Sequence, residues 1–465
     1  MDSLAAAADA RFEDGVRLLD TAQPAQALAC FRDAIAMAPD FAEAHANIAY
    51  LLDQDGDASA AEMHYRRALA LEPGLAQTWL NFGGFLTRER RPGEAEEACR
   101  RAVFLDSAHP AAWSNLGVLL TAGKREAEAE QCYRTALALD PAHAKSAFNL
   151  AYLLLRQGRY EEGWARFESR DWYQATAARL RCPRWSGEAL AGKSVLVGTE
   201  AGHGDMIQFS RYAPLLKHKG AVRVSLLCHA PLKPLLSTLH GVDEVIAADE
   251  ELDADGWDFW TPPLSLPRLL ETTLDSIPAA IPYLFADAAR VQRWAARMGG
   301  GTGELRVGLV WKGNPRFEND ADRSLPSLAM LAPLGAIPGV RFYSLQKGAG
   351  EDEALQPPPA LALTHLGGDI SDFADTAAIM TNLDRVIAVD TAAAHLAGAL
   401  GRPCWVLLPD YWTDWRWLAD RRDSPWYPAT MRLFRQPPGG GWDVVIEELG
   451  DALRTQAATL PARTP

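Results

Sequence analysis

The sequence predicts an α-helical superhelix followed by an α/β region that contains two doubly wound parallel sheets. Small, aromatic and proline residues recur every 34 residues through the first third of the chain. From residue 193 onward, short apolar strands alternate with helices, as in sheets that are covered on both faces. A glycine-rich run at residues 299–303 divides this alternating region. We therefore expect three domains, at residues 1–180, 190–298 and 304–465.

The first domain is organised by columns of residues that share the 34-residue spacing. One column holds proline or serine, one holds small residues and one holds mainly aromatic residues. The columns are Pro39, Pro73, Ser107 and Pro141; Ala27, Ala61, Ala95, Ala129 and Gly163; and Phe31, Tyr65, Cys99, Tyr133 and Phe167. This pattern, over residues 8–175, resembles the tetratricopeptide repeat, a helix pair in which small residues let the helices approach closely.

Stacked repeats of this kind form a superhelix with a concave surface. We expect this surface to bind a protein. The alternative uses are a spacer and a dimerisation arm, and a dimerisation arm would make the protein a homo-oligomer. Aromatic residues after the last repeat are expected to pack it against the following domain; they are Trp164, Phe167, Trp172 and Trp185.

The overall composition excludes several classes of function. A net charge of −14 argues against nucleic acid as the main partner, because phosphate binding needs clustered Lys and Arg. No apolar run approaches the roughly 18 residues that span a bilayer. The acidic N-terminus lacks the basic start of a secretory signal, and the six cysteines form no CxxC pair. These features predict a cytoplasmic protein with reduced thiols.

A strand and a helix near residue 390 form the first candidate site. Residues 386–389 are a β-branched, apolar strand, and Asp390 and Thr391 precede a small-residue helix at 392–400. The unpaired N–H groups at such a helix start suit a phosphate, and His395 is close enough in sequence to share the site. The alternative is that Asp390 and Thr391 only cap the helix and that His395 belongs to the core.

Two further loops of the third domain carry cations. Lys312 and Asn314 follow its first strand, and Arg323 follows within the same loop. Gln346 and Lys347 follow the next strand. Cations here would neutralise a leaving diphosphate. The alternative is an ordinary solvated loop with a local ion pair.

The loop after the first strand of the second domain offers proton acceptors. It places Glu200, His203 and Asp205 at the mouth of that sheet, where a carboxylate or imidazole can accept a proton from an attacking hydroxyl. The alternative role of Asp205 is a helix N-cap. The chain has no GxGxxG after a strand and no P-loop, and its two Asp-Ala-Asp triplets do not directly follow strands, so we expect no metal and no cofactor.

Residues 411–428 are unusually aromatic. Aromatic side chains there would stack on a nucleotide base or sugar. Packing over a long loop explains them equally well.

These motifs together resemble a bacterial architecture. The ones that carry the resemblance are GHGDMIQFSRY, WKGNPRFENDADRSLP, YSLQKG, DTAAAHLAGALGRPCWVLLP and WRWLADRRDSPWYP, in that order. They are similar to tetratricopeptide repeats followed by a GT-B glycosyltransferase, a fold of two Rossmann-like domains, of the ADP-heptose–lipopolysaccharide heptosyltransferase type. Nucleocytoplasmic O-GlcNAc transferases and flagellin glycosyltransferases share this plan.

The resemblance implies roles for individual residues. It makes Asp205 the base, and it makes Asp390, Thr391 and His395 contacts of the donor diphosphate and sugar. Arg323, with Lys312 second, would meet the diphosphate. Relatives with repeats usually read Glu-Gln-Gly-x-Gly-Asp in the first loop, whereas this chain reads Glu-Ala-Gly-His-Gly-Asp, so His203 is a second candidate base.

The expected function is an inverting, metal-independent glycosyltransferase that moves a sugar from a nucleotide sugar to Ser or Thr of a protein. The second domain would face the acceptor and the third would hold the donor. The repeats would recruit the acceptor, and flagellin is one candidate. The alternatives are a transferase that acts on lipopolysaccharide or another glycan, and a non-catalytic repeat scaffold.

Overall fold

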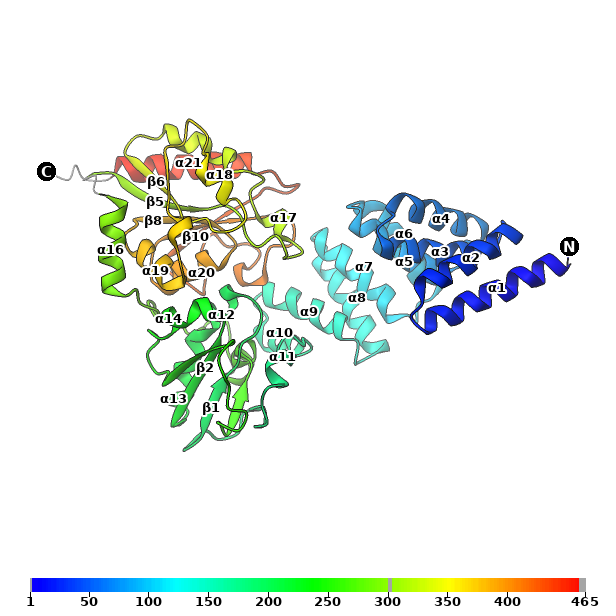
Figure 1. Cartoon of the computed structure of the whole chain (residues 1–465), viewed down its shortest axis with the longest axis horizontal. Coiled ribbons are helices and arrows are strands. Elements are labelled where there is room, and N and C mark those ends of the chain that lie inside the picture. The colour runs from blue at the N-terminus through cyan, green and yellow to red at the C-terminus, as the bar shows by residue number, and fades with distance from the viewer. Residues whose placement is uncertain (1, 300–302, 460–465) are drawn as a thin grey trace. The chain divides into compact units, whose positions relative to one another are not determined.

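The computed structural model describes residues 2–299 and 303–459 (Figure 1). The chain divides into two compact units, residues 1–153 and 154–465. The division lies inside a helix, so the last helices of the expected repeat domain belong to the same unit as the sheets. The centre of the expected glycine linker, at residues 300–302, lies outside the described residues.

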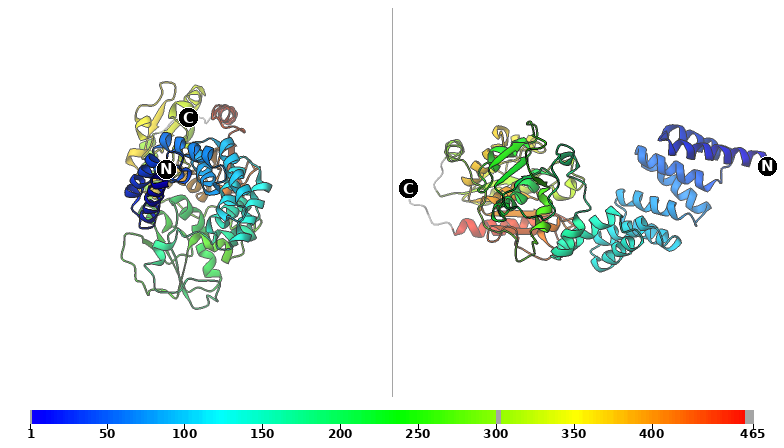
Figure 2. Two further views of the ribbon diagram at one scale, coloured as in Figure 1. Left: turned by 90° about the vertical axis from the view of Figure 1, so that its right-hand side faces the viewer. Right: turned by 90° about the horizontal axis from the view of Figure 1, so that it is seen from below.

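The first unit consists of helices joined by short turns and packed in pairs. Figure 2 shows these pairs side by side along an arc. Each helix pair buries its facing sides only when it is stacked on its neighbours, which is why the array forms a superhelix. The helices up to the division are α1 (Asp2–Asp20), α2 (Pro24–Met37), α3 (Ala42–Asp55), α4 (Ala58–Leu71), α5 (Ala76–Arg88), α6 (Pro92–Leu105), α7 (Pro110–Ala122), α8 (Glu126–Leu139) and α9 (Ala144–Arg156).

The 34-residue columns form the contacts within each helix pair. Phe31, Tyr65 and Tyr133 are fully buried or nearly so. Gly117 of α7 faces Tyr133 of α8, and a Cβ atom at Gly117 would lie 2.6 Å from the tyrosine ring. A large side chain on one helix therefore fills the space left by a small residue on its partner, as the columns predict.

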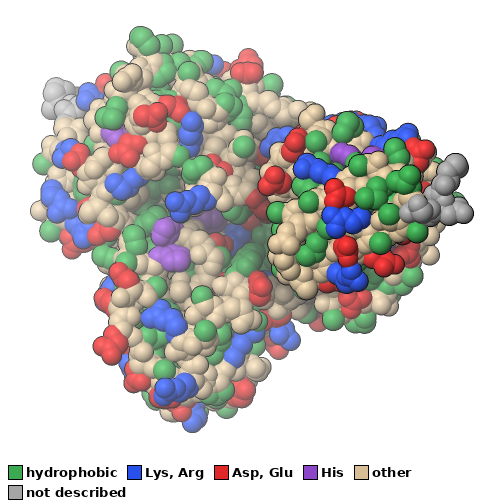
Figure 3. Space-filling view, turned by 45° about the vertical axis from the view of Figure 1, so that its right-hand side comes forward, with side chains coloured by type: hydrophobic (Ala, Val, Ile, Leu, Met, Phe, Trp, Pro, Cys, Tyr) green, Lys and Arg blue, Asp and Glu red, His purple; other side chains and the backbone are tan. Residues whose placement is uncertain are grey.

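The outer surface of the repeats carries ion pairs that follow the same period. Figure 3 shows basic and acidic side chains next to one another over these helices. Arg91 Nη1 lies 2.8 Å from Glu62 Oε1, and Arg125 Nη1 lies 2.7 Å from Glu96 Oε1. Such exposed pairs contribute little to stability individually, so the buried columns are the main source of stability in the array.

The second unit contains two parallel sheets. The four-stranded sheet has the order β3-β2-β1-β4 and the six-stranded sheet has the order β10-β9-β8-β5-β6-β7. Their strands are almost wholly apolar because helices cover both faces. The strands are β1 (Ser194–Val197), β2 (Arg223–Cys228), β3 (Glu244–Ala247), β4 (Phe259–Thr261), β5 (Leu305–Val310), β6 (Val340–Ser344), β7 (Leu363–His365), β8 (Arg385–Val389), β9 (Cys404–Leu408) and β10 (Met431–Arg435).

Helices connect the strands and complete this unit (Figure 1). The expected strand at 386–389 lies within β8, and the expected helix at 392–400 is α20. The α-helices are α10 (Tyr160–Phe167), α11 (Gln174–Ala177), α12 (His203–Phe209), α13 (Ala213–His218), α14 (Lys233–Leu236), α15 (Leu266–Leu269), α16 (Ala288–Met298), α17 (Asp320–Arg323), α18 (Glu351–Leu355), α19 (Phe373–Thr381), α20 (Ala392–Ala399) and α21 (Asp443–Ala458). The 3-10 helices are η1 (Ser210–Tyr212), η2 (Ala230–Leu232), η3 (Pro263–Ser265), η4 (Leu328–Ala336), η5 (Gly367–Asp369) and η6 (Trp415–Trp417).

An aromatic cluster joins α10 to the loop that follows β9. The Trp164 ring meets the Trp415 ring edge-on at 5.2 Å, and Trp164 Nε1 donates to Thr272 O at 3.0 Å. Trp426 is fully buried in the same cluster. For these tryptophans of the 411–428 segment, the packing alternative is therefore correct, because no face of a fully buried ring is left for a nucleotide.

None of the helices among the described residues is both long and apolar enough to cross a bilayer.

Candidate active site

The expected site residues lie on loops at the points where each sheet changes direction. In the first sheet, β1 has β2 on one side and β4 on the other, and in the second sheet β5 lies between β6 and β8. The loops after β1, β5 and β8 leave the carboxyl ends of these central strands. Ligands of open parallel sheets bind at such switch points.

Helices α12 and α20, one from each sheet, pack against each other at these switch points. A Cβ atom at Gly204 of α12 would lie 3.0 Å from His395 Cδ2 and 3.3 Å from Ala392 Cα. The absence of a side chain at Gly204 allows this close approach. The structure therefore brings the Asp205 helix and the Asp390–Thr391 helix together.

Asp205 is the third residue of α12, and Gly202 is the N-cap. The N-cap alternative for Asp205 is thus wrong in position, although its carboxylate still satisfies the helix start. Asp205 Oδ2 accepts a hydrogen bond from the Gly202 N–H at 2.9 Å, and Oδ1 accepts one from Arg416 Nη2. Both oxygens of the candidate base are therefore engaged.

Arg416, which the sequence interpretation did not include, connects the two halves of the site. Its side chain is only 7% exposed. Besides Asp205, Nε donates to Gln208 Oε1 at 2.6 Å and Nη1 donates to both carboxylate oxygens of Asp414 at 3.0 Å. The sequence did carry a signal for Arg416, because it stands between Trp415 and Trp417, which are both buried in the structure. An arginine that is buried with its neighbours needs carboxylate partners.

Asp390 follows β8 and is surrounded by charges. Burial raises the pKa of Asp390 to about 6, and the negative charge of Asp414 adds to this rise. The positive charges of Arg323 and Arg416 oppose it. Asp390 therefore titrates close to neutral pH, as candidate functional groups often do.

Thr391 is the N-cap of α20, but its side chain makes no capping hydrogen bond. Its hydroxyl instead donates to Val389 O at 3.2 Å. The first N–H groups of α20 thus have no side-chain cap from Thr391, which leaves them suited to an anion.

His395 is the fourth residue of α20, and its side chain is buried. Its Nδ1 lies 3.0 Å from the Tyr427 hydroxyl. Burial lowers the pKa of His395 well below its usual value, and the nearby Arg416 and Arg211 lower it further. His395 is neutral at pH 7, so it can exchange hydrogen bonds with a ligand but supplies no positive charge.

His203, the second candidate base, is the first residue of α12. Its ring centroid lies 4.8 Å from His229 and 5.1 Å from Phe373 of α19. Burial lowers the pKa of His203 to about 4, and His229 contributes to this shift. His203 is therefore neutral at pH 7, and its lowered pKa makes it a weaker base than an ordinary histidine.

The loop after β5 places Arg323, but not Lys312, toward Asp390. Arg323 Nε donates to Asp320 Oδ1 at 3.1 Å, and its guanidinium lies 4.3 Å from the Phe317 ring centroid. Its charge reaches Asp390, whereas Lys312 pairs with Glu353.

Three other expected contacts make hydrogen bonds in the loops that follow β5 and β6. Gln346 Oε1 accepts from the N–H groups of Trp311 and Lys312 at 2.9 and 3.0 Å, and Nε2 donates to Lys312 O at 3.0 Å. Gln346 thereby shapes the β5 loop. Asn314 and Lys347 are exposed; Asn314 Oδ1 accepts from Arg316 N at 3.1 Å, and Lys347 Nζ lies 3.4 Å from Gly367 O.

The cluster can bind an anion and accept a proton. The start of α20 and Arg323 suit phosphate oxygens, and His203 or Asp205 supplies the acceptor from the facing helix. Within residues 2–299 and 303–459, no group of three or more His, Cys, Asp or Glu side chains is placed to hold a metal ion.

Three family models match segments of the repeats. Residues 12–76 and 132–165 match two tetratricopeptide repeat models, and residues 45–128 match the middle TPR-like domain of cilia and flagella-associated protein 70. PilF of Pseudomonas aeruginosa is 27% identical, with a TM-score of 0.34 over 36% of this chain and 77% of PilF. MamA of Desulfovibrio magneticus RS-1 is 19% identical, with a TM-score of 0.32 over 35% of this chain and 91% of MamA.

One curated relative extends further along the chain. Protein FlbA of Caulobacter vibrioides is 30% identical over 333 residues, which are 66% of this chain and 54% of FlbA. The chain thus spans about half the length of this relative. The helices of the first unit are tetratricopeptide repeats, and over 66% of its length the chain is similar to FlbA.

Proposed function

We propose that the protein is an inverting, metal-independent glycosyltransferase of the GT-B type that moves a sugar from a nucleotide sugar to Ser or Thr of a protein. The observation that carries this proposal is the packing of α12 on α20. It brings the helix that carries His203 and Asp205 against α20, whose start suits a diphosphate. Two parallel sheets that meet through their switch-point loops are also the arrangement expected of a GT-B enzyme.

In the proposed reaction, the acceptor hydroxyl oxygen attacks the anomeric carbon of the donor. The bond between that carbon and the diphosphate oxygen breaks, with inversion, and the base takes the hydroxyl proton. The start of α20 and Arg323 stabilise the charge that develops on the leaving nucleoside diphosphate. His395 is neutral, so its role is to hydrogen-bond the donor sugar or phosphate.

Two residues compete for the role of base. Asp205 already accepts hydrogen bonds on both oxygens. The ring nitrogens of His203 accept no hydrogen bond from the described residues. His203 therefore has no hydrogen-bond partner within the described part of the chain to exchange for the substrate hydroxyl, but its lowered pKa makes it a weak base. Asp205 has to exchange a partner for the substrate hydroxyl.

Two variants separate these roles. If His203 is the base, His203→Gln lowers kcat by roughly 100-fold or more and Asp205→Asn lowers it less; the reverse order assigns the role to Asp205. Transfer is measured with radiolabelled nucleotide sugars that differ in base and sugar, against lysate proteins. The enzymatic role is rejected if neither transfer nor hydrolysis occurs with any donor, which leaves a repeat scaffold.

The concave side of the repeats supports recruitment of a protein. A cavity of about 510 Å³ crosses α3, α5, α7 and α9, and its lining includes Asn81 and Asn115, which are 34 residues apart. None of the described residues hydrogen-bonds to the Asn115 amide. Side-chain amides repeated along a groove suit the N–H and C=O groups of an extended peptide.

The recruitment role predicts a selective loss. Replacing Asn81 and Asn115 by Ala should raise KM for a protein acceptor several-fold and leave hydrolysis of the nucleotide sugar unchanged. Labelled protein is separated from labelled lipopolysaccharide on a gel, so a label that appears only in glycan supports the glycan-directed alternative. Flagellin is the first protein acceptor to supply in this assay.

A further inference from the structure

The turn after β1 is held by the segment that follows the last repeat helix. We call residues 198–205 the β1 turn and residues 167–177 the α10–α11 segment. The β1 turn carries both candidate bases. Strand β1 places the turn at the switch point of the first sheet. The α10–α11 segment also holds the turn, because it contacts three of its consecutive residues.

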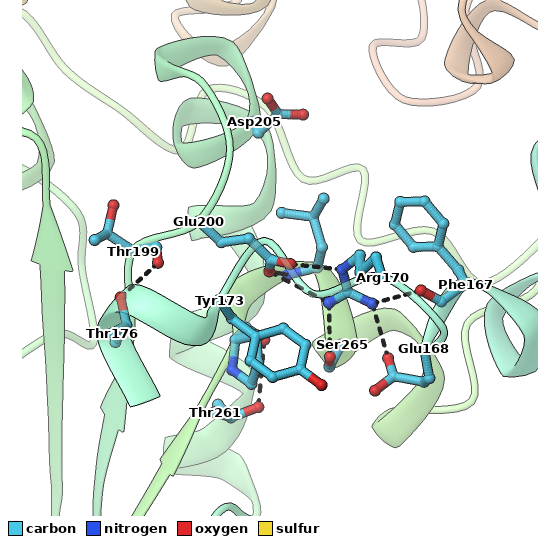
Figure 4. Close-up of polar contacts among 12 residues, drawn as sticks. Phe167, Glu168, Arg170, Tyr173, Thr176, Thr199, Glu200, Asp205, Thr261 and Ser265 are labelled. Atoms are coloured by element: carbon cyan, nitrogen blue, oxygen red, sulfur yellow. Dashed lines mark hydrogen bonds and ion pairs between the residues drawn. The ribbon is translucent and has the colours of Figure 1, made fainter. Parts of the chain in front are cut away.

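The strongest of these contacts is a buried ion pair between Arg170 and Glu200 (Figure 4). Both side chains have no exposed surface. Arg170 Nε donates to Glu200 Oε1 at 2.5 Å, and Nη2 donates to Glu200 Oε2 at 3.3 Å. Glu200 Oε2 also accepts from the Leu264 N–H at 3.3 Å. The carboxylate at the start of the turn is therefore fixed from two directions.

The same arginine is itself held by two residues of its own segment and by Ser265 of η3. Arg170 Nη1 donates to Phe167 O at 3.0 Å and to Glu168 Oε1 at 3.1 Å, and Nη2 donates to Ser265 Oγ at 2.8 Å. Figure 4 shows the guanidinium surrounded by these acceptors. An arginine with this many partners has one orientation, so it transmits the position of its segment to Glu200.

Two neighbouring residues of the turn contact Thr176 of α11. A Cβ atom at Gly198 would lie 2.9 Å from Thr176 Cγ2, and Thr176 Oγ1 donates to Thr199 O at 2.8 Å. Because a side chain at position 198 would collide with Thr176, the turn comes this close to the segment only with glycine at that position.

The turn also stores local strain. Ala201 has φ of 58°, in the left-handed region that residues with a Cβ atom rarely adopt. Its carbonyl accepts a hydrogen bond from His229 Nε2 at 3.0 Å. A strained conformation persists only where its surroundings determine it, and such strain gathers at functional sites. Glu200 directly precedes Ala201 in the sequence, and Arg170 pairs with Glu200.

We propose that Arg170 and Glu200 are positioning residues of the transfer site: their ion pair holds the strained β1 turn so that His203 and Asp205 face α20. The inference rests on the proposed function. It also makes the end of the repeat array part of the catalytic unit, because the arginine comes from the segment after α10.

A buried ion pair is poor evidence for stability alone, since apolar residues of similar size often replace such a pair without loss. This property allows a test that separates positioning from stability. The test uses the full-length chain with Arg170→Lys, and with the paired change Arg170→Met and Glu200→Leu. Lysine keeps the charge but cannot bond both carboxylate oxygens in the same geometry.

Two readouts apply to each variant. One is transfer, where displacement of a base by about 1 Å is expected to lower kcat by roughly 100-fold with a smaller change in KM. The other is the NMR titration of His203, which does not need activity. Its pKa of about 4 depends first on burial, so a released turn should move the pKa toward 6.5.

Glu168→Gln is the matched control, because Glu168 bonds the same guanidinium but does not touch the β1 turn. This variant should keep the His203 titration and keep transfer within about two-fold. The proposal predicts that the Met/Leu pair unfolds at the wild-type temperature while transfer falls and the His203 pKa rises. If the Met/Leu pair does not fold, Arg170→Lys provides the same comparison.

Three results would overturn the inference. One is wild-type transfer and titration in the folded Met/Leu pair or, if that pair does not fold, in Arg170→Lys. Another is an equal effect of Glu168→Gln and Arg170→Lys. The third is loss of activity with an unchanged His203 titration. If the wild-type protein transfers no sugar, the proposed function fails, but the His203 titration still decides whether the ion pair holds the turn.

Discussion

Arg416 interacts with four titratable groups of the site: Asp205, Asp414, Asp390 and His395. It pairs with Asp205 of α12 and with Asp414 of its own loop, and its charge also lowers the pKa of Asp390 and of His395. A phosphate that entered the site would compete with these carboxylates for the same cations. The charged state of the carboxylates therefore affects how well an anion binds.

Removing the guanidinium should destabilise the second unit. Arg416→Gln leaves Asp205 and Asp414 partly buried without a counter-charge, which should cost roughly 2–4 kcal/mol in the free energy of unfolding. Urea unfolding followed by circular dichroism measures this change. Arg422→Gln is the control, because Arg422 is 80% exposed and its pair with Glu448 should contribute less than about 1 kcal/mol. Equal losses in both variants would contradict the role given to Arg416.

Binding of a nucleoside diphosphate should strengthen as the pH falls through 6. The pKa of Asp390 is raised to about 6, so Asp390 is mostly ionised at pH 7.5 and mostly protonated at pH 5.5. Protonation removes a negative charge next to the phosphate site, and a bound anion favours the protonated form in return. Calorimetry at both pH values measures the effect. Asp390→Asn provides the baseline for titration of the nucleotide, and an identical pH dependence in this variant would show that Asp390 does not contribute.

The pairing of α12 with α20 depends on a glycine. The two helices belong to different sheet regions, and each is the first helix after a central strand of its sheet. Because their first turns touch, a small change in the separation of the helices changes the distance between the proton acceptors and the proposed phosphate site. Gly204 is the point at which this separation is set.

Gly204→Ala should push the two helices apart. The new methyl group would lie 3.3 Å from backbone atom Ala392 Cα, as well as 3.0 Å from His395 Cδ2. Overpacking of this kind costs about 1–3 kcal/mol, and thermal unfolding measures it. Gly450→Ala in α21 is the control, since its nearest atoms lie 3.6 Å away and alanine should stabilise the helix interior by about 0.5–1 kcal/mol. A neutral Gly204→Ala would mean that the helices are free to separate.

Along the chain, the division into compact units comes earlier than the end of the sequence repeats. The 34-residue columns continue to Phe167, yet the compact units divide between residues 153 and 154. Helix α10 retains the repeat pattern but buries Trp164 and Phe167 against the sheets' loops. A fragment of the second unit that begins at the end of the repeat pattern would therefore lose part of its own core.

This division predicts how fragments behave. A fragment of residues 154–465 should unfold in one cooperative transition, whereas residues 190–465 should aggregate or bind a hydrophobic dye. The shorter fragment lacks Trp164 and Phe167, which are nearly fully buried, and it lacks Arg170. Thermal unfolding and limited proteolysis measure the difference. Equal stability of the two fragments would place the boundary near residue 190.

Several site residues could be anticipated because their signals are local. Asp390 and Thr391 stand between a β-branched strand and a small-residue helix, and this pattern alone places them at a helix start. His203 and Arg323 lie in the connections that follow the apolar strands β1 and β5, in helices α12 and α17. The sequence also indicates that Gln346 follows a strand, which is β6 in the structure. Its hydrogen bonds to the β5 loop depend on how β6 lies beside β5, and no sequence pattern indicates them.

The repeat period, the strands of both sheets and the loops that carry the candidate residues follow from patterns of a few to a few dozen residues. Such patterns reflect which side chains one helix or one strand can bury. The partners of the charged groups do not follow from them: Arg416 lies 211 residues from Asp205, and Arg170 lies 30 residues from Glu200 on a different element. Those pairs form because the packed elements bring the charges together away from water, where an unpaired charge is too costly to remain.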